Sequence, residues 1–233
     1  MAALPGFWYL FLMRALFVIC TVLLLNHALG QPTGTDNTIK KYFDFTRSQS
    51  LIYTGAAFTS YDASTITHPY FIKDSLTNGA VRYDGVWYED IPLLYDIFND
   101  KLIVCNTNGN YLCPSPEKIE RFLLAGHTFI QTPKGYYDLL ATGKLTIEAK
   151  RQKVVEEFNS TVDVKRTTVQ RDYFFAVIGG KYSPLNNIRS LIDLMGEKKE
   201  TVRQYLRQQR IDTRKDKELA LIKAADYYNN LSR

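Results

Sequence analysis

The chain has 233 residues, of which 45% are apolar and 13% are aromatic, and 29 Lys and Arg stand against 24 Asp and Glu. This apolar content is ordinary for a globular protein, and without a low-complexity segment the composition excludes a disordered chain. The length allows one substantial core, or a core with a small appendage.

Residues 1–30 predict an export signal. Arg14 is their only charged residue, the apolar run Ala15–Leu25 follows it, and Ala28 and Gly30 are small residues at the −3 and −1 positions of a signal-peptidase site. A cationic residue, an apolar run and a small-x-small site are typical of a secretory signal. We expect cleavage after Gly30. The alternative is an uncleaved anchor, but the run after Arg14 is too short to span a bilayer.

Three further segments follow the predicted signal peptide. Residues 31–40 are polar and contain Pro, Gly and Thr, which is typical of a flexible leader. Residues 41–183 carry repeated hairpin signals and predict an antiparallel β domain. Residues 184–233 have helical periodicity and predict a basic helical tail, packed on the β domain or beside it.

The stretch Asn78–Asn110 has the clearest pattern in the β domain. Short apolar or aromatic runs alternate there with Asn-Gly, Asp-Gly and Asn-Asp pairs. Asn-Gly and Asp-Gly accept φ > 0 at both central positions of a type I′ turn, whose twist matches that of antiparallel strands. We therefore predict a β-meander over Val81–Asn110. Pro92 cannot donate to a ladder, so it is expected at a bulge, a strand start or an edge; Asp90 is interpreted as a turn or bulge residue.

Similar runs occur before and after this meander. Lys144–Lys153 alternates apolar and polar side chains with the period of two that a half-buried strand shows, whereas Glu156–Val169 is weaker and is interpreted as strand or loop. The runs total about ten short strands, as expected of a barrel or a sandwich. The remaining strand candidates are Leu51–Gly55, Tyr70–Lys73, Leu93–Phe98, Leu102–Cys105, Ile119–Leu124, His127–Gln131, Tyr136–Leu140, Tyr173–Ile178 and Lys181–Tyr182.

The pattern changes at Pro184, where helical periodicity begins. Leu185–Met195 has an apolar helical stripe with Gly196 as its C-terminal cap, Glu197–Ile211 predicts a second helix, and a third begins after Asp212 or Thr213. The predicted fold class is α+β: a mainly antiparallel β-meander, barrel-like or sandwich-like, with a C-terminal helical segment.

Two cysteines remain after the predicted cleavage, Cys105 and Cys113, on either side of the turn TNGN. A three- or five-residue loop centred on Gly109 would let them face each other, and a disulfide would then form in an oxidising compartment. A two-residue turn would instead pair Cys105 with Leu112 and strain the bridge. The disulfide is the favoured alternative. Two thiols without a nearby histidine do not complete a metal site.

The helical tail carries the net charge of the mature chain. From Lys198 to Arg233 the balance is +5, whereas the whole mature chain carries +4. One interpretation is attraction to an anionic membrane surface. The favoured interpretation is a solvated helix face, since acids are interspersed. Nucleic acid is not expected as a partner, given the export signal. The candidate surface residues are Lys198, Lys199, Arg203, Arg207, Arg210, Arg214 and Lys215.

No set of residues in the sequence predicts catalysis. His68 and His127 each lie beside strand residues, but HxH, HxxxH and HExxH spacings are missing. Glu89 and Asp90 are adjacent, so on a strand they point to opposite faces and cannot act as paired carboxylates. We assign no catalytic residue, metal or cofactor. A histidine within hydrogen-bond reach of a carboxylate inside a cleft would favour an enzyme.

Aromatic side chains are abundant in the predicted strands. In a closed barrel some of them would line a ligand cavity, but more often such rings fill the core and cross-strand positions, and this interpretation is favoured. The candidate lining residues are Tyr83, Trp87, Tyr88, Tyr95, Phe98 and Phe129.

Four strings carry a resemblance to a known group. GAVRYDGVWYEDIPLLYDIFNDKL, the LxGHxF of Leu124–Phe129, GYYDLLxxGK and EKKExxxYLR resemble a group of small, uncharacterised exported proteins of Bacteroidota, over most of the mature chain. The resemblance implies export to a Gram-negative envelope, in the periplasm or outer envelope. It implies no catalytic residue.

Three functional hypotheses follow from the sequence. The first is a non-enzymatic binding or structural module of the cell envelope that contacts an unknown protein or ligand through its sheet. The second is a β-barrel carrier of an apolar small molecule, which requires a cavity lined by the aromatic residues. The third is an enzyme with an unrecognised site.

Overall fold

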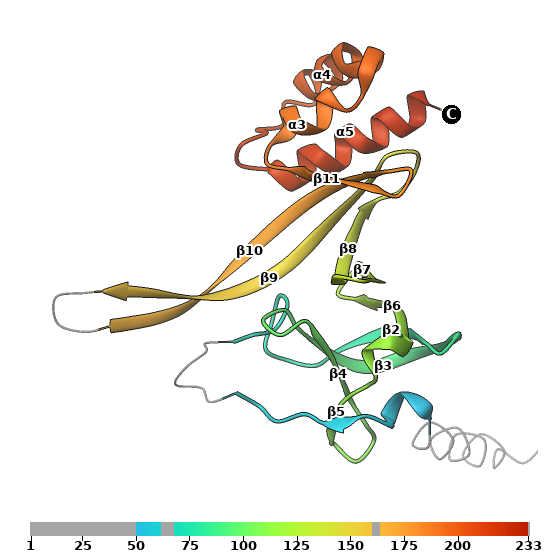
Figure 1. Cartoon of the computed structure of the whole chain (residues 1–233), viewed down its shortest axis with the longest axis vertical. Helices are drawn as coiled ribbons and strands as arrows, with labels where there is room; N and C mark the ends of the chain where they lie inside the picture. Colours follow the sequence, from blue (N-terminus) through green and yellow to red (C-terminus); the bar gives the residue numbers. More distant parts are fainter. Residues whose placement is uncertain (1–49, 62–67, 160–163, 233) are drawn as a thin grey trace, which may run out of the picture. The chain divides into compact units, whose positions relative to one another are not determined.

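The computed structural model describes residues 50–61, 68–159 and 164–232, without the side chains of residues 157–166 (Figure 1). The predicted signal peptide and the flexible leader lie outside the described residues. Within the described residues, no helix has the length and apolarity that a membrane crossing requires.

Eleven described strands form one antiparallel sheet in the order β1-β5-β4-β3-β2-β6-β7-β8-β9-β10-β11. The α+β class and the antiparallel meander are thus confirmed. Because β1 and β11 are free edges, the described sheet does not close into a barrel. The strands are β1 Ala56–Ala57, β2 Thr77–Tyr83, β3 Val86–Asp96, β4 Lys101–Cys105, β5 Tyr111–Cys113, β6 Ile119–Leu124, β7 His127–Thr132, β8 Gly135–Ala141, β9 Thr146–Asn159, β10 Val164–Ile178 and β11 Lys181–Leu185.

The predicted turn chemistry is found at several hairpins, but the predicted Asn78-Gly79 turn is wrong because both residues lie within β2. Asp84 and Gly85 join β2 to β3 with φ of 52° and 80°, as a type I′ turn requires. Ala125 and Gly126 join β6 to β7 with φ of 52° and 83°. The order of the described strands departs from a simple meander twice, because β6 pairs with β2 and β1 pairs with β5.

A bulge in β3 directs its second half toward the core. Val81 pairs with Tyr88 and Gly79 with Ile91, so Glu89 and Asp90 together oppose one residue of β2. Asp90 has a φ of 55°, which agrees with its predicted bulge position.

Two predicted strands are wrong. Leu51–Tyr53 forms a 3-10 helix, η1, which buries Ile52 completely. In the Tyr70–Lys73 segment only Tyr70 bridges to a strand, at Asp96. The chain reverses there, because Ile72 has a φ of 61° that an extended strand cannot contain.

One face of the sheet is buried in two places. Near β2, β3, β6 and β7 it carries an aromatic core that includes Tyr95, Phe122 and Phe129. Near β8 to β11 it packs against helices through Ile147, Phe174 and their neighbours. The helices are α3 Ile188–Asp193, α4 Lys199–Gln208 and α5 Lys217–Leu231, with 3-10 helices η2 Pro116–Lys118 and η3 Gly196–Lys198.

The helical tail is part of the core. Leu221, Ala224 and Ala225 of α5 are fully buried against the sheet. The Asn229 side chain accepts a hydrogen bond from the Leu145 amide (3.0 Å) and donates to its carbonyl (2.8 Å). These bonds attach the end of α5 to the start of β9.

Strands β9 and β10 form a long ribbon that extends past its neighbours (Figure 1). β8 pairs with β9 only up to Ala149, and β11 pairs with β10 only from Phe174 onward. The weakly patterned Glu156–Val169 segment therefore lies mostly in strands.

Candidate functional site

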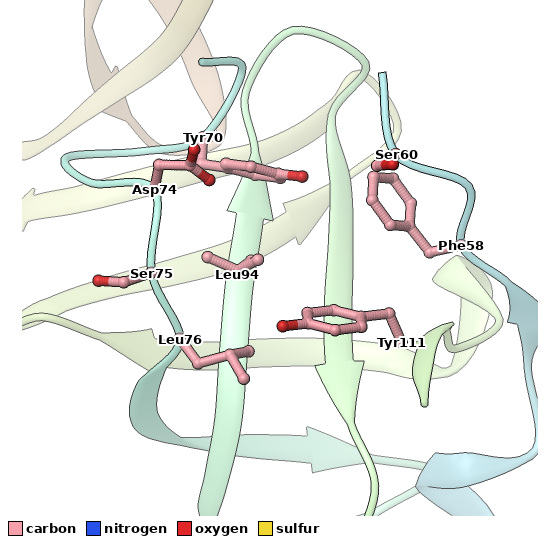
Figure 2. A pocket seen from close by; sticks show the side chains of 8 residues that line it. All are labelled: Phe58, Ser60, Tyr70, Asp74, Ser75, Leu76, Leu94 and Tyr111. Carbon is pink, nitrogen blue, oxygen red and sulfur yellow. The ribbon is translucent and has the colours of Figure 1, made fainter. Parts of the chain in front are cut away.

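A pocket of about 370 Å³ opens on the face of the sheet opposite the aromatic core, near the β1 edge (Figure 2). β3 and β5 form part of its wall, and the segments after β1 and before β2 form the rest. Leu94 reaches this face because it alternates with Leu93 and Tyr95, which point into the core. The lining residues are Phe58, Ser60, Tyr70, Asp74, Ser75, Leu76, Leu94 and Tyr111.

The floor and walls of this pocket, which we call the Asp74 pocket, combine apolar and hydroxyl groups. Tyr70 and Leu94 belong to a small buried cluster against which Phe58 and Leu76 pack. The Phe58 and Tyr70 rings lie 6.5 Å apart. Figure 2 shows these rings and Tyr111 around one space. The pocket therefore offers ring surfaces together with hydroxyl groups.

Among the described residues, Asp74 is the only charged one that lines the pocket. Its carboxylate lies beside the Tyr70 ring in Figure 2. Burial, and secondarily the negative charge of Asp74, raise the pKa of the Tyr70 hydroxyl. Tyr70 is therefore a neutral phenol at physiological pH that can donate a hydrogen bond, and Asp74 can accept one.

A strained turn holds the wall that contains Asp74. The Lys73 amide donates to the Phe71 carbonyl at 2.7 Å across Ile72, whose φ is 61°. This is a γ-turn with a positive central φ, which is rare and strained, and a β-branched side chain is unfavourable there. The Ile72 side chain is 53% exposed, so burial does not explain its presence. Such strain is concentrated at ligand clamps and active sites.

A buried lysine anchors the same wall to the β9 strand. The Lys153 ammonium donates to the carbonyls of His68 (2.9 Å) and Tyr70 (2.8 Å) and lies 3.1 Å from the His68 ring. Burial lowers the pKa of Lys153, and burial followed by the Lys153 charge lowers the pKa of His68. The His68 ring thus lies beside a lysine, and the His68 carbonyl helps to attach the wall to β9.

The second predicted histidine lies in a buried ion cluster. The His127 Nδ1 is 2.8 Å from the Asp138 carboxylate. That carboxylate also accepts hydrogen bonds from Arg151 at 2.6 and 3.0 Å. Arg151 donates further to Asp172 at 2.9 Å and to Glu218 of α5 at 2.7 and 2.9 Å.

This ion cluster has a structural role. Asp138 and Arg151 are 1% and 4% exposed, so the carboxylate that orients His127 is already bound by a guanidinium. The hydrogen bond to Asp138 raises the pKa of His127. Burial opposes the charge of Arg151, but the hydrogen bonds that it donates to Glu218 and Asp138, together with their negative charges, raise its pKa. The cluster joins strands β7 to β10 to helix α5.

The aromatic residues predicted to line a ligand cavity do not form one. Three of the six are core residues with at most 2% exposure, one packs against the core, and one is 45% exposed on the β3 strand. None of the six lines the Asp74 pocket. In order, the core residues are Tyr83, Tyr95 and Phe129; the packed residue is Tyr88; the exposed one is Trp87; and Phe98 contacts Tyr61.

The predicted disulfide is wrong for this structure. The β4–β5 register pairs Val104 with Leu112 and Cys105 with Tyr111, so Cys105 and Cys113 are not opposite one another. Both thiols are free. Cys113 instead pairs with Ala56 of β1 and packs in the apolar cluster under the pocket.

The basic residues of the tail fall into two groups. Lys198 donates to the Leu231 carbonyl and to the Ser232 hydroxyl, and Arg203 pairs with Glu200. These two cations are engaged in local contacts. The exposed residues are Lys199, Arg207, Arg210, Arg214 and Lys215.

The pocket residues were missed by sequence reasoning. Most of them come from a polar stretch after β1 and an irregular stretch before β2, which lack a recognisable motif, and Leu94 and Tyr111 come from β3 and β5. No family model matches the chain, and it matches no curated protein and no solved structure.

Proposed function

We propose that this chain is a non-enzymatic binding module of the cell envelope, exported through its first 30 residues, and that its ligand occupies the Asp74 pocket. The observation that supports the binding role is a concave site with three rings, several hydroxyls and one carboxylate, held by a strained turn. Ligand sites usually combine such apolar walls with a few polar groups that fix orientation.

The chemistry of the lining indicates the class of ligand. Asp74 brings a negative charge and is the only charged lining residue in the part of the chain that the structure describes. It favours a ligand that donates hydrogen bonds, through an ammonium or through hydroxyl groups. The rings favour an apolar face on the same molecule. The volume of about 370 Å³ lies near the lower end for small-molecule sites, which favours a ligand smaller than most drugs.

Two alternatives have less support. A barrel carrier needs a closed, aromatic-lined interior, whereas the described sheet has two free edges and its rings pack against each other. The feature that would favour an enzyme is a histidine within reach of a carboxylate inside a cleft, and neither histidine lines the Asp74 pocket. His127 shares its carboxylate with Arg151, and His68 contacts Lys153.

Native mass spectrometry of the protein purified from its own envelope tests the proposal. We expect an additional small-molecule mass that is released on mild denaturation. In parallel, the recombinant chain is titrated by isothermal calorimetry with phenethylamine and with methyl β-glucoside, which separate ammonium from hydroxyl donors.

Asp74→Asn is the informative variant, because it keeps the shape of the side chain and removes its charge. A charge-assisted hydrogen bond contributes about 1.5–3 kcal/mol, so an ammonium ligand should bind at least about tenfold more weakly. Asp84→Asn, in the exposed β2–β3 turn, is the matched control. A bare mass together with no saturable binding of either probe would refute the proposal.

A further inference from the structure

The other end of the sheet has a second cavity, of about 250 Å³. It lies between the β7–β8 turn and the edge strand β11, far along the strand order from the Asp74 pocket. We call it the Tyr182 cavity. Its lining residues are Thr132, Pro133, Lys134, Tyr137, Phe175 and Tyr182.

Three aromatic rings form its wall. Tyr137, Phe175 and Tyr182 lie 5.6, 6.0 and 6.2 Å apart in pairs, with interplanar angles between 58° and 71°. Each ring contacts the other two, so the three rings form one continuous aromatic surface. Tyr137 is 5% exposed and anchors the group, whereas Tyr182 is 43% exposed at the sheet edge.

The C-terminal helices pack on the other face of the sheet. Phe174 packs with the helices, and its neighbour Phe175 therefore points to the opposite face. Asp138 likewise points into the ion cluster, and Tyr137 points away from it. The aromatic wall thus lies on the face that the helices leave open.

Two charged groups near this wall, Glu148 and Lys150, are engaged by neighbouring side chains, whereas Lys134 is exposed. Glu148 is 4% exposed and accepts a hydrogen bond from the Tyr182 hydroxyl at 2.9 Å, and burial raises its pKa. Lys150 lies 5.5 Å from the Tyr137 ring centre, but its ammonium is bound to Asp100 at 2.5 Å. Of the described residues that line the cavity, only Lys134 is charged, and it is exposed.

We infer that the Tyr182 cavity binds a single-ring aromatic anion. The ring would lie against Tyr137, Phe175 and Tyr182, and its carboxylate or phosphate would contact Lys134. At about 250 Å³ the cavity is smaller than drug-sized sites, which favours one ring over a fused system. The preferred charge is opposite to that of the Asp74 pocket.

Benzoate and benzylammonium, which share a ring and differ in charge, test this inference. The recombinant mature chain, labelled with ¹⁵N, is titrated with each at pH 7.5 and followed by amide chemical shifts. We expect benzoate to shift the amides of Lys134 and Gly135 saturably. We expect it to bind about fivefold or more tightly than benzylammonium at this cavity, as one exposed charge pair allows.

Three variants complete the test. Lys134→Gln should remove the preference for benzoate, whereas Lys144→Gln, an exposed lysine in the next turn, should keep it. Tyr182→Leu should weaken benzoate binding about fivefold, as the loss of one ring contact predicts. Asp74→Asn should leave benzoate binding unchanged, so this site and the Asp74 pocket are judged separately.

The inference is overturned if benzoate causes no saturable shift at Lys134 and Gly135. It is equally overturned if benzylammonium binds there as tightly as benzoate, or if Lys134→Gln retains the full preference for the anion.

Discussion

Replacement of Arg151 by Met should destabilise the protein severely. The guanidinium makes five hydrogen bonds to three carboxylates and is 4% exposed. Asp172 and Glu218 have side chains that are 26% and 34% exposed, so water can solvate them once the arginine is gone. Asp138 is 1% exposed, and its Oδ1 already has no hydrogen-bond partner among the described residues. The cost therefore falls mainly on Asp138.

Removal of one partner from a buried ion pair costs about 3–5 kcal/mol. The total free energy of unfolding of a domain is about 5–15 kcal/mol, so Arg151→Met should remove a large fraction of it. Methionine keeps most of the apolar contact with the rings of Phe71 and Phe174, between which the guanidinium lies. The loss therefore reports the electrostatic change more than a cavity.

Urea unfolding of the recombinant chain, followed by circular dichroism, measures this loss. The double variant Arg151→Met/Asp138→Leu should recover most of the stability, since an apolar replacement of both partners is often neutral. Arg203→Gln, which breaks an exposed pair within α4, is the control and should cost about 0.5 kcal/mol or less. A loss below about 1 kcal/mol for Arg151→Met, or no recovery in the double variant, would refute the reasoning.

Three further variants test separate features. The hydrogen bond to Asp138 raises the pKa of His127, so the protonated imidazole stabilises the folded state. This stabilisation is complete below about pH 6.5 and is lost as the pH rises through the raised pKa. His127→Gln should therefore flatten that part of a stability–pH profile. Asn229→Ala removes the three hydrogen bonds that attach α5 to the β8–β9 connection and should cost about 2–3 kcal/mol in chemical unfolding, whereas its exposed neighbour Asn230→Ala should cost far less. Ile72→Gly should raise the free energy of unfolding by about 1 kcal/mol because it relieves a positive φ, and Ile178→Gly, in a regular strand, should lower it; an unchanged Ile72→Gly would argue against strain.

The sheet was predictable because its signals are local. Turn pairs such as Asp84-Gly85 and the alternation in Lys144–Lys153 depend on neighbours in sequence. The structure has strands on both sides of Asp84-Gly85, and most of Lys144–Lys153 lies in β9. The 3-10 helix at Leu51–Tyr53 was not predictable in this way. Its apolar residues resemble a strand, and the burial of Ile52 that fixes the segment depends on distant parts of the chain.

Most of the candidate site could not be predicted either, because it depends on contacts between distant parts of the chain. The Asp74 pocket depends on where the 70–76 segment lies against β3 and β5, and pairing between distant strands is not encoded by spacing. The ion cluster is a stronger case, since Arg151 and Glu218 are 67 residues apart. His127 was identified, but its partner Asp138 could be found only from the strand register.

The free thiols show how a small difference in register changes chemistry. The prediction of a disulfide depended on a loop that would set Cys105 opposite Cys113. The observed loop sets Cys105 opposite Tyr111, two residues away. Both thiols should therefore react with iodoacetamide after unfolding without a reductant.

The bonds of Asn229 have a consequence for the order in which the chain can fold. They join a residue close to the C-terminus with Leu145 and Thr142, more than 80 positions earlier. Contacts so distant in sequence form late, because a long loop must close first. The second half of the sheet therefore cannot complete its core until α5 has been synthesised. A chain that stays incomplete until its last helix is made remains suitable for transport in the unfolded state, which is compatible with the export that we propose.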